Sequence, residues 1–126
     1  MLKVLPIQTK AEQEELCRKC NVKFDPDLLA YSATVDDRLA GICQFKLTDK
    51  GGIIYDIAPA KDFYSFDALF VMGRGALNFI DLCGVHNAIY KGDIEDERLL
   101  LAIGFKKDSA GDFSINLEGF FTDHCH

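Results

Sequence analysis

The sequence of 126 residues lacks any apolar run long enough to cross a membrane. Its longest uninterrupted apolar runs, residues 68–72 and 99–103, hold five residues each, whereas a membrane-spanning helix needs about 20. The amino-terminal stretch reaches a proline at position 6, too soon for the apolar centre of a secretory leader. These absences predict a cytoplasmic protein that does not bind a membrane.

The sequence also lacks a surplus of basic residues. Lysine and arginine number 14 against 20 aspartates and glutamates, which gives a net charge of −6. An acidic surface repels phosphate backbones, so nucleic acid is a poor partner for this chain. Any phosphate-bearing ligand would need a local cluster of basic groups or backbone amides.

A secreted disulfide framework is not indicated, because the five cysteines are an odd number without a secretion leader. We expect free thiols, most of them small core residues. One alternative is a zinc site built from Cys17, Cys20 and the tail residues His124, Cys125 and His126. Three-residue spacing in a helix equally describes a shared buried face, so the sequence favours no metal site.

What the sequence does contain is the composition of one globular domain, expected to span residues 1–126. Hydrophobic residues make up 48% and charged residues 27%. Residues 24–27 fit a loop or a short helical turn. Periodicity and capping residues predict helices at residues 11–20, 66–83 and 94–103, and strands at 2–7, 29–35, 38–48, 53–58, 87–91, 105–107 and 113–117.

Two tight turns, Asp36-Asp37 and residues 49–52, join three successive strands into an antiparallel meander. A long helix, a strand, a helix and a carboxy-terminal hairpin follow. The predicted fold class is α/β (α+β) with a mixed sheet, since the order is not the strict alternation of a doubly wound sheet.

This order of elements resembles the GNAT acetyltransferase superfamily over nearly the whole chain. The local matches are Gly104-Phe105 after the late helix, the strand that follows Gly51-Gly52 and ends at Pro59, and Gly84 closing the long helix. The resemblance implies acetyl-CoA as cofactor and a small-molecule or peptide amine as acceptor. It also implies that backbone amides near Ile57 and Ala58 polarise the thioester, and that amides of Ser65, Phe66, Asp67 and Ala68 hold the pyrophosphate.

The chain departs from the family where the cofactor is held. The family's glycine-containing phosphate segment is matched by residues 64–69, which have no glycine and place Asp67 where an anion should lie. Leucines at 99–101 replace a tyrosine that serves many members as general acid, and Asp93 replaces an asparagine. A displaced phosphate loop at residues 73–76 is the alternative, but glycine within a helical pattern favours close packing.

Candidate catalytic residues follow from the same resemblance. Tyr31, Tyr55 and Asp56 lie on meander strands that face the acceptor cleft in this fold, and Tyr55 or Asp56 would activate an amine. Strand alternation alone also accounts for Tyr55 as core and Asp56 as a solvated edge. His86 is either a base or a polar loop residue.

Two hypotheses follow. The first is an acyl-CoA-dependent N-acetyltransferase in which the amine attacks the thioester directly. The second is a catalytically degenerate GNAT-like domain that serves as a binding or regulatory module, with a homodimer as one possible form.

Overall fold

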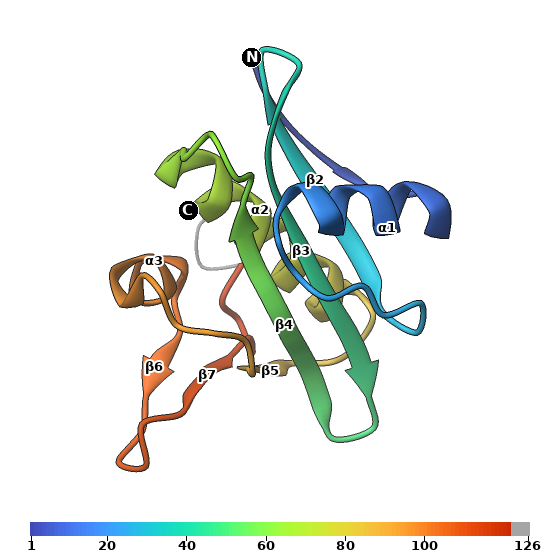
Figure 1. Cartoon of the computed structure of the whole chain (residues 1–126). Helices are drawn as coiled ribbons and strands as arrows, with labels where there is room; N and C mark the ends of the chain where they lie inside the picture. The colour runs from blue at the N-terminus through green and yellow to red at the C-terminus, as the bar shows by residue number, and fades with distance from the viewer. Residues whose placement is uncertain (122–126) are drawn as a thin grey trace.

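The structure is a computed structural model that describes residues 1–121, over which seven strands form one sheet flanked by three helices (Figure 1). None of the described helices is long and apolar enough to cross a membrane. In chain order the elements are β1 (Leu2–Pro6), α1 (Lys10–Lys19), β2 (Leu29–Val35), β3 (Arg38–Thr48), β4 (Gly51–Pro59), α2 (Phe66–Leu82), β5 (Asn87–Tyr90), α3 (Glu97–Ile103), β6 (Lys106–Lys107) and β7 (Phe113–Asn116).

The strands lie in the order β1-β2-β3-β4-β5-β7-β6. Neighbouring strands are antiparallel except β4 and β5, which are parallel because α2 returns the chain between them. The predicted α/β (α+β) mixed sheet is therefore confirmed, with its three-strand meander, long helix and carboxy-terminal hairpin.

The helices divide the core between the two faces of the sheet. On one face α1 packs through Cys17 and Cys20 against Ala30 and Ile42. On the other face α2 and α3 cover a larger apolar cluster (Figure 1). The long helix was predicted from an apolar stripe, of which Leu69, Met72, Ala76 and Ile80 are buried there, whereas Phe79 is partly buried and Cys83 is exposed.

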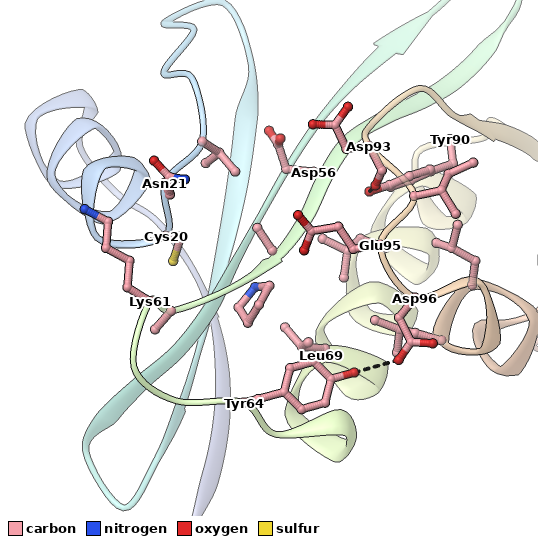
Figure 2. A pocket seen from close by; sticks show the side chains of 18 residues that line it. Cys20, Asn21, Asp56, Lys61, Tyr64, Leu69, Tyr90, Asp93, Glu95 and Asp96 are labelled. Atoms are coloured by element: carbon pink, nitrogen blue, oxygen red, sulfur yellow. Dashed lines mark hydrogen bonds between the residues drawn. The ribbon is translucent and has the colours of Figure 1, made fainter.

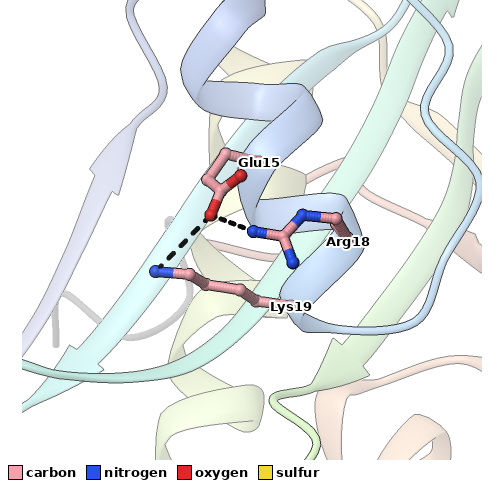
Figure 3. A network of polar contacts seen from close by, with 3 residues as sticks. All are labelled: Glu15, Arg18 and Lys19. Carbon is pink, nitrogen blue, oxygen red and sulfur yellow. Dashed lines mark hydrogen bonds and ion pairs between the residues drawn. The ribbon is translucent and has the colours of Figure 1, made fainter.

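The outer surface of α1 is polar. Glu15 accepts a hydrogen bond from Arg18, and its carboxylate lies 3.9 Å from the Lys19 ammonium (Figure 3). All three side chains are largely exposed, so these ion pairs stabilise the helix only weakly. Thr9 begins the helix by accepting a hydrogen bond from the Glu12 amide at 3.1 Å.

The late helix is shorter than the sequence predicted. It begins at Glu97 rather than residue 94, because Asp96 is its N-cap and accepts a hydrogen bond from the Arg98 amide at 3.1 Å. The backbone angles of Asp96 are extended, so the helix cannot begin before the residue that follows it. Residues 94–96 are therefore left in the loop that leads from β5 to α3.

The glycines at residues 73–76 lie within α2, which rules out a displaced phosphate loop. A Cβ on Gly73 would lie 2.6 Å from Cδ1 of Ile103 in α3, so glycine permits close approach of the two helices. The predicted packing role is confirmed for Gly73. Beside it, Arg74 donates to the Ile103 carbonyl and its guanidinium lies between the rings of Phe70 and Phe120.

Candidate functional site

The sheet opens between its two parallel strands. β4 and β5 are paired from Gly52 to Ile54, and the Lys91 amide makes a last bond to the Ile54 carbonyl at 2.8 Å. The register between β3 and β4 shifts at Gln44, which leaves Tyr55 as an extra residue on β4. Such a bulge bends its strand. Beyond it β4 continues beside β3 as far as Pro59, while the chain after β5 turns away.

A cavity of about 390 Å³ lies at this opening (Figure 2). Its walls come from both faces of the sheet. Residues 20–22 at the end of α1 border it on one side, and Leu69 of α2 with Leu99 and Leu100 of α3 border it on the other. Residues 56–61 of β4 and its exit form the wall between them, so the cavity lies at the point where the two strands separate.

The cavity is acidic. Among the described residues that line it, four are carboxylates, Asp56, Asp93, Glu95 and Asp96, whereas Lys61 is the one lysine or arginine (Figure 2). Like charges confined to one pocket repel each other and repel anionic ligands, and they attract cations. The loop from β5 to α3 supplies three of the four carboxylates.

Asp56 is the carboxylate that comes from the sheet itself. Nε2 of Gln44 donates to its Oδ2 at 2.6 Å. Burial raises the pKa of Asp56 above its ordinary value, the hydrogen bond from Gln44 opposes that rise, and the charge of Asp93 adds to it. Asp56 is therefore a pocket carboxylate rather than a solvated strand edge.

Tyr90 fills part of the gap between the separated strands. Its hydroxyl donates a hydrogen bond to the Asp93 carbonyl at 3.0 Å. Burial raises the pKa of Tyr90, so the phenol stays protonated at neutral pH. Gly92 is required here, because a Cβ would lie 2.2 Å from the Tyr55 carbonyl and 2.6 Å from the Tyr90 hydroxyl.

The role of Tyr90 was not predicted from the sequence. The sequence pattern does not distinguish a tyrosine at the end of a short strand from an ordinary core residue. Only the separation of β4 from β5 brings Tyr90 into the lining of the same cavity as Ile57. The Ile57 amide belongs to the group expected to polarise a thioester carbonyl.

Tyr64 joins the segment before α2 to the start of α3. Its hydroxyl donates to Oδ2 of Asp96 at 2.8 Å, as the dashed line in Figure 2 shows. This hydrogen bond lowers the pKa of Asp96, while burial is the main cause that raises the pKa of Tyr64. The contact links the two segments that border the cavity on the side of α2 and α3.

The predicted pyrophosphate segment lies between two residues of the cavity lining, Tyr64 and Leu69. Ile57 and Ala58 also line the cavity, whereas Ser65, Phe66, Asp67 and Ala68 are not among its described lining residues. Ser65 is the N-cap of α2, and its hydroxyl accepts the Ala68 amide at 3.2 Å. Asp67 lies in the first turn of the same helix. One helix amide is therefore already bonded, and a carboxylate stands next to it.

Two of the other candidate residues lie elsewhere. Tyr31 packs against the rings of Phe45 and Phe79, at centroid distances of 5.6 and 6.2 Å, in the core beneath α2. Its predicted place at an acceptor cleft is wrong, because strand alternation turns it to the α2 face. The structure places Tyr55 at the bulge of β4, and only its backbone approaches the site, through Gly92.

His86 lies in the turn after α2. Its Nδ1 is 2.6 Å from Oδ1 of Asp81, and this hydrogen bond raises the pKa of His86. The polar-loop interpretation of this residue therefore fits its surroundings. The tail residues 124–126 of the zinc alternative lie outside the described residues, and within the described part Cys17 and Cys20 have no metal-binding group of three or more ligands around them.

No protein-family model matches the chain, and no curated protein matches it in sequence. Solved structures do match. The spermidine N-acetyltransferase of Vibrio cholerae has a TM-score of 0.70 at 10% identity, with 97% of each chain covered. The ribosomal-protein-S18-alanine N-acetyltransferase of Escherichia coli has a TM-score of 0.68 at 10% identity, over 93% of this chain and 94% of that one.

A GNAT family acetyltransferase of Brucella melitensis, solved with acetyl-CoA, has a TM-score of 0.67 at 13% identity and covers 92% of this chain and 88% of its own. Identities this low establish the fold and leave activity open. The chain therefore has the GNAT acetyltransferase fold, as the order of its elements predicted.

Proposed function

We propose that this chain is a GNAT-fold binding domain that holds a cationic amine in the cavity between β4 and β5 and does not transfer an acetyl group to it. The observation that supports this most directly is the charge of the cavity lining, in which the described residues include four carboxylates and a single lysine. Such a lining attracts cations and repels a phosphate-bearing cofactor.

The charges of the site support the same proposal. Coenzyme A brings several phosphate charges, which require basic side chains or unbonded amides at a helix start. Lys61 is the one basic residue among the described cavity residues, against four carboxylates. The Ala68 amide is bonded to Ser65, and Asp67 stands in the same turn. The residues present do not fit acetyl-CoA, and they do fit an ammonium group.

The second candidate is an acyl-CoA-dependent N-acetyltransferase, and Asp56 favours it. Burial raises the pKa of this carboxylate, which suits a base that accepts a proton from an amine near neutral pH. Cys20, Asn21 and Val22 line the same cavity as Asp56.

Binding measurements with two probes separate the candidates. The full chain is titrated with acetyl-CoA and, separately, with spermidine as a linear cationic amine, by calorimetry and thermal unfolding. A ligand of the native state raises the unfolding temperature, and a concentration of 100 times Kd stabilises by about 2.7 kcal/mol. We expect spermidine to raise the unfolding temperature and millimolar acetyl-CoA to leave it unchanged.

Two variants sharpen the result. Asp56→Asn should weaken spermidine binding, because it removes one pocket charge without changing the size of the side chain. Tyr90→Phe removes the phenol hydroxyl from the cavity, yet acetyl-CoA should still fail to bind, since the carboxylates remain. Saturable acetyl-CoA binding to the unaltered chain, with release of free thiol when an amine is added, would establish the acetyltransferase instead.

A further inference from the structure

Two glutamines are buried between α1 and the sheet. Gln13 of α1 is 2% exposed and Gln44 of β3 is fully buried. They are the buried polar side chains of the described chain, and every buried polar atom there has a partner. A buried amide destabilises a core unless it is fully bonded, and apolar residues would fill the same space at lower cost.

The two amides form a directed chain of hydrogen bonds that ends at the cavity. Nζ of Lys10 donates to Oε1 of Gln13 at 3.0 Å. Nε2 of Gln13 donates to Oε1 of Gln44 at 2.9 Å, and Nε2 of Gln44 donates to Asp56 at 2.6 Å. An ammonium group can only donate, so its position fixes which way each amide points. The last donor in the chain is thereby aimed at the carboxylate.

The same amides hold one wall of the cavity. Nε2 of Gln44 also donates to the Lys23 carbonyl at 2.8 Å, and Nε2 of Gln13 reaches the Leu28 carbonyl at 3.3 Å. Both carbonyls belong to the loop between α1 and β2. That loop begins with Asn21 and Val22, which line the cavity. One network therefore fixes the carboxylate and the adjoining backbone together.

We propose that Gln44, oriented by Gln13 and Lys10, is a positioning residue that aims the ionised Asp56 carboxylate into the cavity to bind the ammonium group of the ligand. This inference rests on the proposed amine-binding function and names the residue that prepares the site for it. A donor fixed on the carboxylate favours its charged form, which is the form that an ammonium group binds. Gln44 itself does not line the cavity and acts through Asp56.

Several other ionisable groups lie near Asp56. Burial raises the pKa of Cys17 to about 11 and of Cys20 to about 12, and it also raises the pKa of Cys43 and Tyr90, so these four are neutral between pH 4 and 8. The charged groups that line the same cavity are Lys61, Asp93, Glu95 and Asp96. Titration of Asp56 in that range therefore reports on Gln44, on these four charged neighbours and on the ligand.

The first test needs no ligand. The carboxyl carbon of Asp56 is followed by NMR against pH in the unaltered chain, in Gln44→Met and in Gln13→Met. Loss of a hydrogen bond to a charged group should raise the Asp56 midpoint in Gln44→Met by about one pH unit or more. Gln13→Met keeps the bond from Gln44 and should raise it less. A folded Gln44→Met with an unchanged midpoint overturns the inference.

The second test uses spermidine as probe. Gln44→Met should bind spermidine about tenfold more weakly than the unaltered chain, because the Asp56 carboxylate loses the hydrogen bond that orients it toward the ammonium group. Combining Gln44→Met with Asp56→Asn should weaken binding no further than Asp56→Asn alone, because both changes act on one carboxylate. Additive losses contradict the inference.

The two proposals fail in different ways. If spermidine does not bind the unaltered chain, the proposed function fails, while the NMR midpoint still tests whether Gln44 positions Asp56. If Gln44→Met does not fold, Gln44→Glu has the same size and brings a second carboxylate to Asp56. It should raise the Asp56 midpoint further, and an unchanged midpoint would again overturn the inference.

Discussion

At the scale of single residues, Asp56 is a charged group in a place that disfavours charge. Burial raises its pKa, and the hydrogen bond from Gln44 recovers only part of the difference. Such a carboxylate lowers the stability of the folded chain at neutral pH, and the proposed amine ligand would supply the charge that compensates it.

Asp56→Asn should make the chain more stable at neutral pH. The folded pKa of Asp56 is raised above the ordinary value of 3.8, so in the interval between them the folded state binds more protons than the unfolded state. The unaltered chain therefore loses stability as pH rises through the folded pKa. The asparagine variant, whose Oδ1 still accepts from Gln44, lacks that loss. Urea unfolding from pH 3 to 7 measures the difference.

The control for this prediction is Asp37→Asn, at an exposed turn position. It should change the free energy of unfolding little and by a similar amount at each pH. A stability difference between Asp56→Asn and the unaltered chain that stays constant across the pH series would contradict the assigned burial effect.

At the scale of elements, α2 presents two glycines to different surroundings. The Cβ position of Gly73 is 2.6 Å from the buried Ile103 side chain of α3, and the Cβ position of Gly75 is 3.5 Å from Val4 of β1, an ordinary contact. Gly73 is therefore needed for helix packing, whereas Gly75 only lowers the helix propensity at its position.

Opposite effects are expected from the same substitution at these two positions. Gly73→Ala should destabilise by about 1–3 kcal/mol through overpacking, less the gain in helix propensity. Gly75→Ala should stabilise by up to about 1 kcal/mol, because the helix gains propensity without a clash. Urea unfolding of both variants measures this. Equal effects at the two positions would mean that α2 and α3 are not in close contact.

Element boundaries were predicted well where both the apolar pattern and a cap agree. The long helix was expected at residues 66–83 and runs over Phe66–Leu82, because Ser65 caps its start and Gly84 has a positive φ just beyond its end. The late helix was placed three residues too early. Acidic residues suit both the first turn and the N-cap, and composition alone does not choose between them.

At the scale of the whole molecule, the charge balance affects stability. The net charge is −6, and four carboxylates line one cavity. Added salt should therefore raise the free energy of unfolding at pH 7, because mutual repulsion is screened beyond a Debye length of about 10 Å at 0.1 M. Urea unfolding across a sodium chloride series measures this. Urea unfolding near the isoelectric point of about 4.9 is the control, and there the same salt series should have little effect. A fall in the free energy of unfolding with salt at pH 7 would indicate that attractive ion pairs dominate.

The sequence by itself determined the order and type of the elements, because alternation, the apolar stripe of α2, caps and turns are local properties that add up along the chain. It also placed Ile57, Ala58 and Asp56 on the right strand. The tertiary structure alone decided how the site is built. Gln13 and Gln44 are 31 residues apart, and Tyr90 lines the same cavity as Ile57 only because β4 and β5 separate. Contacts between distant segments depend on how strands bend and helices pack, and no local pattern encodes them.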